Sequence, residues 1–355
     1  MHYWPHFVPP VALLVLAAGL LAPMTAPLLL ACIVALLAAV VAAVHHAEVV
    51  AQRVGEPYGT LVLALAITVI EVALVLSIML AGGANAAAVA RDTIYAAVMV
   101  ICNAVVGICL LLGGLRHGEQ SFRIEGTGTG LAALVALSTL VLVIPALTTS
   151  SPGGTYTDSQ LVFVALSSIT LWVAFVFIQT VRHRDYFLPA VAADDETIHA
   201  APPSVAQAWT SVGLLLASLV SVVGLAKVMS PSIEAAVLAA DAPKAVVGVL
   251  IAVIVLMPET WAAMRAARAN RLQTSMNLAI GSALASIGLT IPVVVGAAVL
   301  LDLPMTLGLV PKDIAMLALT FVVAAITLGS GRTNLMQGAV HLSIFAAFMF
   351  LTLVP

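Results

Sequence analysis

Long apolar runs, separated by short polar breaks, follow one another along the whole chain. They predict eleven helices, which cover residues 8–22, 27–52, 59–80, 91–113, 129–147, 159–182, 207–229, 244–265, 272–301, 311–328 and 335–353. A helix needs about 20 apolar residues to cross a bilayer, and these runs meet that length repeatedly. The first boundary, between Pro23 and Pro27, is also compatible with one kinked helix. The pattern predicts an all-α integral membrane protein.

Composition excludes a water-soluble protein. Of the 355 residues, 63% are hydrophobic and 8% are charged, whereas a soluble domain carries about 25% charged residues. The lipid bilayer is therefore an expected partner, and a net charge of −3 gives no reason to expect nucleic acid binding. Residues 1–10 contain no Lys or Arg, so the first apolar run is expected to be a membrane span and not a secretory signal.

The distribution of basic residues predicts the orientation. Nine Arg residues lie in or near the loops after the even-numbered helices, whereas four Arg or Lys residues lie on the opposite side. Loops rich in Lys and Arg stay in the cytoplasm. The amino terminus is therefore expected in the cytoplasm, with the protein in the inner (plasma) membrane.

The longest polar stretch divides the chain into parts. We expect an extra amino-terminal helix at residues 1–26, a first five-helix repeat at 27–182, an acidic cytoplasmic linker at 183–206 and a second five-helix repeat at 207–355. The linker contains Asp194, Asp195 and Glu196. It is expected to be either a solvated connection or a regulatory segment that binds cations.

A glutamate occupies the second helix of each five-helix set. Glu71 follows Thr68, and Glu259 follows Pro258, in helices that lie five spans apart. Because five is an odd number, these two helices cross the membrane in opposite directions. The sequence thus predicts two inverted repeats, a plan in which transport sites form near the midplane between the repeats.

Each of these carboxylates is costly in a membrane. A charged residue at the centre of a span costs about 2.5–3.5 kcal/mol on insertion scales, so such residues usually have a function. Pro258 favours a helix break beside Glu259. The alternatives are a neutral Glu71 hydrogen bonded to a neighbouring helix, and an interfacial Glu259 paired with Arg265.

The two carboxylates together suggest ion exchange. A site with two such groups binds Ca²⁺ and also tolerates Na⁺, because both are hard cations that prefer oxygen ligands. Burial and mutual repulsion favour protonation of carboxylates. Cation and proton therefore compete for Glu71 and Glu259, which we predict to be the metal and proton ligands, and no cofactor is expected.

Other polar residues in the spans are candidates for supporting roles. Thr68, Asn103, Ser282 and Ser286 either contribute oxygen ligands or serve the close packing of small residues. At the end of the second predicted helix lie three further candidates. We expect either gating or a plain boundary cluster from His45, His46 and Glu48.

The sequence around both glutamates resembles the calcium/proton exchanger (CAX) family of the calcium/cation antiporter superfamily, in particular its bacterial sodium-calcium/proton antiporters of the ChaA type. The segments that carry the resemblance are Gly55–Thr60, Thr68–Glu71, Met257–Thr260, Asn270–Gln273 and Gly281–Ser286. The resemblance covers nearly the whole chain. It implies that Glu71 and Glu259 bind the cation and exchange it for protons, with support from Asn103, Ser282 and Ser286.

The cation is left open by the departures from the family pattern. Ala285 stands where many relatives have Gln, so Ca²⁺ exchange and exchange of Na⁺ or K⁺ both remain alternatives. A monovalent-only antiporter, a cation channel and an intramembrane enzyme are the alternatives to this function. The chain contains no His-Glu-x-x-His or Gly-x-Ser-x-Gly motif to favour an enzyme. The sequence leaves a homo-oligomer open.

Overall fold

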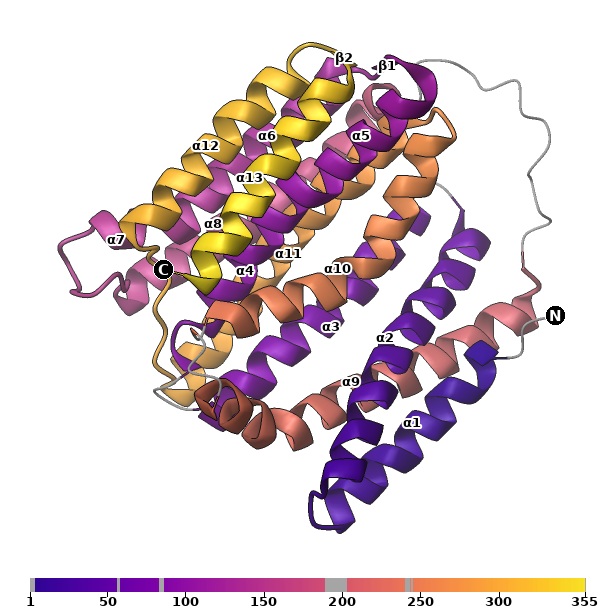
Figure 1. Cartoon of the computed structure of the whole chain (residues 1–355), viewed down its shortest axis with the longest axis vertical. Coiled ribbons are helices and arrows are strands. Elements are labelled where there is room, and N and C mark those ends of the chain that lie inside the picture. The colour runs from indigo at the N-terminus through magenta and orange to yellow at the C-terminus, as the bar shows by residue number, and fades with distance from the viewer. Residues whose placement is uncertain are drawn as a thin grey trace. The chain divides into compact units, whose positions relative to one another are not determined.

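The chain is built almost entirely of helices, as its apolar runs predicted (Figure 1). The computed structural model describes residues 4–55, 58–82, 86–188, 203–239, 243 and 245–354. These residues form two compact units. The first comprises Met1–Ala86 and Asp195–Ala242, and the second comprises Ala87–Asp194 and Pro243–Pro355. Each unit combines a segment of each half of the sequence, and the predicted division into repeats remains a prediction.

Four helices form the first unit. They are α1 (Trp4–Leu21), α2 (Ala26–Val54), α3 (Tyr58–Gly82) and α9 (Val205–Ala239). Helices α1, α2 and α9 pack against one another, and α3 packs on α2 and α9. A break between Leu21 and Ala26 separates α1 from α2, so the alternative of one kinked helix is wrong. Helix α9 continues ten residues beyond the predicted end at 229.

The second unit contains the remaining helices and a short sheet. Its elements are α4 (Val89–Met99), η2 (Val100–Val105), α5 (Val106–His117), β1 (Gln120–Ser121), α6 (Ile124–Ser138), η3 (Thr139–Val143), α7 (Ile144–Leu147), α8 (Asp158–Phe177), η4 (Ile178–Arg182), η5 (Arg184–Phe187), α10 (Ala245–Arg268), α11 (Leu272–Leu301), α12 (Pro311–Leu328), β2 (Arg332–Thr333) and α13 (Leu335–Leu353). The elements η2, η3 and η4 are π-helical turns. Three predicted spans therefore contain local irregularities that hydropathy does not reveal.

Helix α10 is bent where the sequence predicted a break. Its two parts, Gly248–Met257 and Glu259–Arg268, meet at an angle of 51°. Pro258 lies between them and has no backbone N–H to donate to the helix. The bend therefore comes immediately before Glu259.

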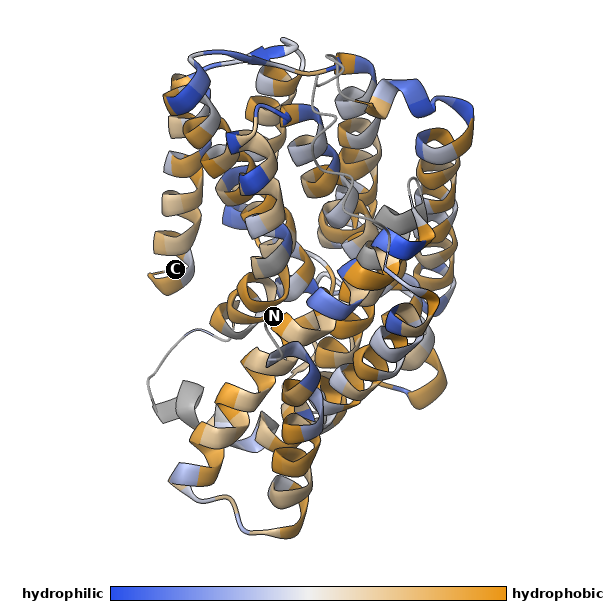
Figure 2. Cartoon of the chain, turned by 90° about the vertical axis from the view of Figure 1, so that its right-hand side faces the viewer, coloured by the Kyte–Doolittle hydropathy of each residue, from blue (hydrophilic) through white to orange (hydrophobic). Residues whose placement is uncertain are grey.

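The described helices have the length and composition of membrane spans. Nine of them are long and apolar enough to cross a membrane, and the bent α10 raises the number to ten. The apolar stretch Ala64–Leu80 of α3 is shorter, so the count of eleven spans remains a prediction. The helices are mostly hydrophobic in Figure 2, and hydrophilic residues are frequent in the connections. Exposed side chains such as Leu14, Phe163 and Ile326 suit a lipid-facing surface.

A polar network that the sequence did not reveal joins two connections of the second unit. Strand β1 pairs antiparallel with β2. The buried Gln120 donates hydrogen bonds from Nε2 to the carbonyl oxygen of Ala267 at 2.9 Å and to Oδ1 of Asn270 at 3.0 Å. Gln273 accepts from the backbone N–H of Arg123 at 2.6 Å. The Asn270–Gln273 segment thus fixes the turn between α10 and α11 to the turn between α5 and α6.

The predicted linker is described only at its ends. Asp194, Asp195 and Glu196 lie outside the described residues, as do Glu56 and Pro57. Residues 183–188 belong to the second unit, where Asn277 Nδ2 in α11 donates to the Phe187 carbonyl oxygen at 2.6 Å. The linker therefore begins as an ordered connection beside α11.

Candidate functional site

Glu71 is buried in the middle of α3. Its side chain is 4% exposed and that of Thr68, one turn earlier, is 5% exposed. The Thr68 hydroxyl donates to the carbonyl oxygen of Ala64 in its own helix at 2.9 Å. Because its proton is used in this bond, the Thr68 oxygen presents lone pairs on the helix face that also bears Glu71. This geometry suits a hydroxyl oxygen that accepts a hydrogen bond or coordinates a cation.

Glu259 is buried immediately after the bend of α10. It is 8% exposed and accepts a hydrogen bond from the hydroxyl of Ser282 in α11. A hydrogen bond to a charged acceptor is stronger than a neutral one, typically about 1.5–3 kcal/mol. The structure thus brings together two residues that the sequence selected separately. The alternative of an interfacial Glu259 paired with Arg265 remains open.

Helix α11 presents a row of small polar side chains on its buried face. Ser282, Ser286 and Thr290 follow one another at intervals of four residues and are all buried. Residues at this spacing lie on the same side of a helix. Of this row, the Ser282 hydroxyl is the one that is bonded to the carboxylate of Glu259. A supporting role for Ser286 in ion binding remains a prediction from the sequence.

Asn103 lies in the π-helical turn η2 and is fully buried. Its Nδ2 donates to Oγ1 of Thr320 in α12 at 3.0 Å. The turn η2 packs against both α10 and α11, the helices that carry Glu259 and Ser282. The second unit therefore gathers four of the six predicted ligands on neighbouring elements. π-Helical turns occur frequently at functional sites.

Glu71 and Thr68 belong to the first unit, whereas the other four candidates belong to the second. The sharing of one ion by Glu71 and Glu259 therefore remains a prediction from the sequence. Within each unit the candidate residues are buried, and several use their hydroxyl or amide protons in hydrogen bonds. Both carboxylates are thus buried within apolar helices, where a negative charge is costly and is stabilised by polar partners, a cation or a proton.

The predicted gating residues lie among the helices of the first unit. His46 is fully buried, with Nε2 at 3.0 Å from the Pro5 carbonyl oxygen and Nδ1 at 3.2 Å from Ser211 Oγ. Nε2 donates to the Pro5 carbonyl oxygen, which can only accept, and Nδ1 is hydrogen bonded to the Ser211 hydroxyl, which can donate or accept. His45 and Glu48 are half-buried beside it. His46 connects α1, α2 and α9, and a gating role for the three residues remains a prediction.

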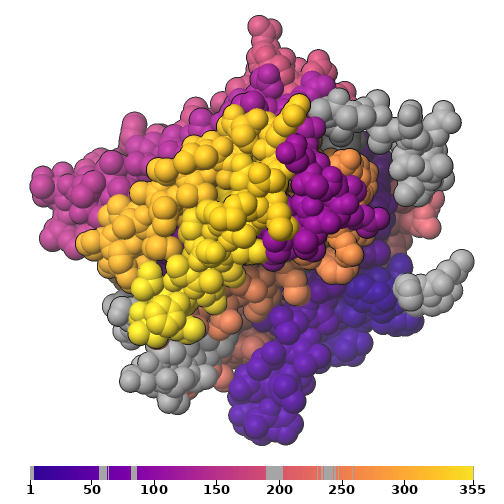
Figure 3. Space-filling model, turned by 45° about the horizontal axis from the view of Figure 1, so that its top comes forward, coloured from indigo at the N-terminus to yellow at the C-terminus, as the bar shows by residue number. Residues whose placement is uncertain are grey.

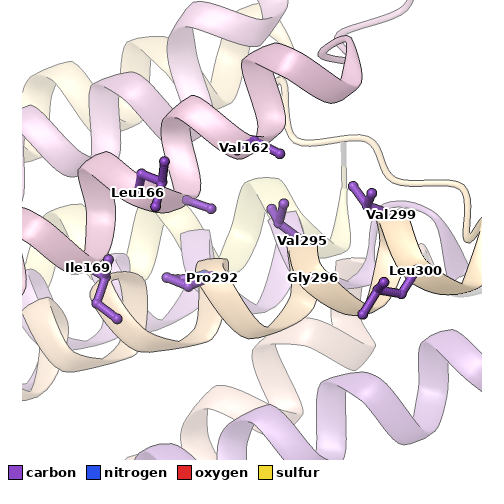
Figure 4. A pocket seen from close by; sticks show the side chains of 9 residues that line it. Val162, Leu166, Ile169, Pro292, Val295, Gly296, Val299 and Leu300 are labelled. Atoms are coloured by element: carbon purple, nitrogen blue, oxygen red, sulfur yellow. The ribbon is translucent and has the colours of Figure 1, made fainter.

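A cavity of about 320 Å³ lies between α8 and α11 (Figure 4). Its lining is apolar and includes Ile169, Leu166, Pro292 and Val295. Hard cations need oxygen ligands. This cavity is therefore unsuited to hold the ion.

Thr320 is a site neighbour that sequence reasoning missed. It is fully buried and bonds to Asn103. In the sequence it stands in an apolar run among other isolated hydroxyl residues, and no spacing relates it to Asn103. The structure places Thr320 on the buried face of α12 with Leu317, Ala324 and Thr327, and hydropathy does not mark that face in a helix that is apolar on all sides.

Comparisons with known proteins agree with this description. The chain is 45% identical to y4hA of Sinorhizobium fredii, which is named as an ionic transporter, over 97% of this chain and 89% of that protein. It is 34% identical to the sodium-potassium/proton antiporter ChaA of Escherichia coli, over 86% of this chain and 82% of that protein. A solved structure of YfkE, a Ca²⁺/H⁺ antiporter, has the same fold, with a TM-score of 0.75 at 17% identity over 99% of this chain and 100% of that one.

The comparisons also test the resemblance that the sequence suggested. The profile of the sodium/calcium exchanger protein family matches residues 24–181 and 210–354, which together are most of the chain. Both glutamates and all the other predicted ligands lie within the matched ranges. The chain therefore belongs to the sodium/calcium exchanger protein family and is a multi-span helical membrane protein.

Proposed function

We propose that this protein is a secondary antiporter that exchanges a cation for protons across the membrane by alternating access. The observation that carries the proposal is the buried Glu259, which follows the bend of α10 and is bonded to Ser282. A carboxylate in this position has a cation or a proton as its natural counter-charge. Membership of an exchanger family supports the same conclusion.

Competition at the carboxylates accounts for the coupling. A cation needs the ionised form of Glu259, and a proton removes that charge. Both ligands therefore cannot occupy the same oxygen atoms together. Glu71 supplies the second carboxylate in the proposed site, and two such groups titrate as a coupled pair. Exchange follows when the site faces each side of the membrane in turn.

The neutral oxygens around the carboxylates complete the proposed coordination. Thr68 in α3, Asn103 in η2 and the hydroxyls of Ser282 and Ser286 in α11 are buried. Hydroxyl and amide oxygens are hard ligands suited to Ca²⁺ and tolerated by Na⁺. We propose Ca²⁺ as a substrate, with Na⁺ or K⁺ as further substrates.

A monovalent-only cation/proton antiporter is the second candidate. Ala285 supplies no oxygen ligand at a position where many relatives have Gln, and a site with fewer polar ligands is less selective for Ca²⁺. The relative ChaA, at 34% identity, is named a sodium-potassium/proton antiporter. The order of cations in a transport assay separates the two candidates.

The proposed location is the inner (plasma) membrane, with the amino terminus in the cytoplasm. The excess of Arg in the loops after even-numbered helices supports this orientation. Under this orientation, the network around Gln120 and Asn270 lies on the cytoplasmic side. A cysteine introduced in a loop and labelled from one side of sealed vesicles tests the orientation.

The experiment that tests the function is proton flux in vesicles that contain the purified protein and a pH-sensitive dye. Ca²⁺, Na⁺ and K⁺ are added separately, and Glu259→Gln and Glu71→Gln are measured beside the wild type. The proposal expects cation-driven proton movement that both substitutions abolish. Glu125→Gln, a change at an exposed glutamate in the first turn of α6, is the matched control and should retain exchange.

Two outcomes would contradict the proposal. Exchange that persists at the wild-type rate in both Gln variants would mean that the ions bind elsewhere. Cation flux without proton movement would favour a channel. This conclusion requires a thermal unfolding transition in detergent, which shows that the purified protein is folded.

A further inference from the structure

The amide of Asn103 is held by two residues on different elements. Nδ2 donates to Thr320 Oγ1 at 3.0 Å and lies 4.0 Å from Met99 Sδ. Thr320 comes from α12, which the sequence did not connect with the ion site. Figure 3 shows α12 and α13 on the surface of the second unit, whereas η2 is buried. The bond to Thr320 thus runs from a peripheral helix to the interior.

The direction of the hydrogen bonds fixes the orientation of the Asn103 side chain. The Thr320 hydroxyl donates to Met99 Sδ at 3.4 Å. Because its proton points to the sulfur, Oγ1 of Thr320 is left as an acceptor and receives the N–H of Asn103. With the amide flipped, the Thr320 hydroxyl would have to turn its proton to Asn103 Oδ1 and give up its contact with Met99 Sδ. The pair Thr320 and Met99 therefore favours the orientation in which Nδ2 faces Thr320, because only this orientation keeps both contacts.

This orientation leaves the other end of the amide as a buried acceptor. Asn103 is fully buried, and its Oδ1 has no hydrogen-bond partner among the described residues. An unsatisfied buried polar group costs about 1–3 kcal/mol. Proteins retain such groups where they serve a ligand or a mechanism. A carbonyl oxygen is a hard ligand of the kind that Ca²⁺ and Na⁺ prefer.

We propose that Thr320 is a positioning residue that holds the Asn103 amide with Oδ1 presented to the transported cation. The inference rests on the proposed function and extends it to α12. Asn103 lies in η2, which packs against α10 and α11, the helices that carry Glu259 and Ser282. Thr320 itself does not touch the cation. It acts by keeping the Nδ2 end of the amide turned away from the site.

A purely structural role for Thr320 gives a different expectation. The hydroxyl would then stabilise the packing of α12 only, and its loss would affect folding without changing the affinity for the cation. A positioning role affects the cation concentration at half-maximal exchange. Removal of one neutral hydrogen bond changes the balance of orientations by about 5- to 10-fold.

The test measures Ca²⁺-driven proton flux, and Na⁺-driven flux in parallel, for Thr320→Val, Thr320→Ser and wild type. The Val variant keeps the shape and loses the hydroxyl, and the Ser variant restores it. Thr327→Val is the matched control, because Thr327 lies on the same buried face of α12 and bonds to His341 Nε2 at 3.1 Å. Thermal unfolding in detergent monitors the stability of each variant, and Thr320→Ala replaces Thr320→Val if the latter does not fold.

The expected result is a 5- to 10-fold higher half-saturating cation concentration for Thr320→Val, with values within about twofold of wild type for Thr320→Ser and Thr327→Val. An unchanged half-saturating concentration in a folded Thr320→Val protein would overturn the inference, as would an equal rise in Thr327→Val. Glu259→Gln is measured in the same vesicles to distinguish a wrong role for Thr320 from a wrong proposed function. If the proposed function is wrong, Glu259→Gln retains exchange; if only the role of Thr320 is wrong, Glu259→Gln still abolishes exchange.

Discussion

Close contact between α5 and α13 makes Gly338 sensitive to the smallest substitution. A Cβ atom at Gly338 would lie 2.6 Å from the backbone nitrogen of Leu111 and 2.9 Å from the carbonyl oxygen of Gly107. Both atoms belong to the main chain of α5, so no side chain can rotate to make room. The two helices must instead move apart. We therefore expect Gly338→Ala to destabilise the protein.

The magnitude follows from two opposing effects. A separation larger by roughly 0.5–1 Å loses a quarter to a half of the dispersion energy at each affected contact, and overpacking of this kind costs about 1–3 kcal/mol. Replacement of Gly by Ala in a helix returns about 1 kcal/mol through backbone entropy. The expected net loss is about 0–2 kcal/mol of unfolding free energy relative to the wild type, and about 1–3 kcal/mol relative to a Gly→Ala change in a helix that meets no neighbouring atom.

The assay is thermal unfolding in detergent, followed by tryptophan fluorescence. Gly296→Ala is the matched control, since nothing lies within 4 Å of a Cβ at that position of α11. The control should unfold at the wild-type temperature or slightly above it, and Gly338→Ala should unfold about 1–4 °C below the control. Equal or higher stability of Gly338→Ala relative to Gly296→Ala would refute the close approach of α5 and α13.

Three further predictions concern polar contacts. Ser282→Ala removes the hydrogen bond to Glu259 and should raise the half-saturating cation concentration about 10-fold, whereas Ser282→Thr should not; proton flux measures both. Gln120→Ala leaves the Ala267 carbonyl without its bond and should lower the unfolding free energy by about 1–3 kcal/mol, measured by thermal unfolding. His46→Ala should destabilise the first unit by a similar amount and increase amide exchange in α1, measured by hydrogen–deuterium exchange.

The membrane helices and the central glutamates were predictable from the sequence because their signals are strong. Apolar runs of span length have few alternatives to a membrane helix, and the carboxylates of Glu71 and Glu259 stand out in such runs. The bend at Pro258 also followed from local chemistry, since proline removes a backbone donor. These features depend on short stretches of chain and need no knowledge of neighbours.

Other features depend on neighbours and could not be predicted. Helices in a membrane are apolar on all sides, so hydropathy does not distinguish the buried face of α12 from its lipid face. The bond between Thr320 and Asn103 joins residues more than 200 positions apart. The π-helical turn at Asn103 has no hydropathy signal, and the pairing of β1 with β2 joins segments of two residues each.

Competition between cation and proton at one site is tested by measuring the half-saturating Ca²⁺ or Na⁺ concentration for proton exchange over about two pH units around neutrality. Competition predicts that this concentration rises as the pH falls, by up to about tenfold per pH unit for each competing proton, while the maximal rate changes less. A half-saturating concentration that is independent of pH in the wild type would contradict the shared site.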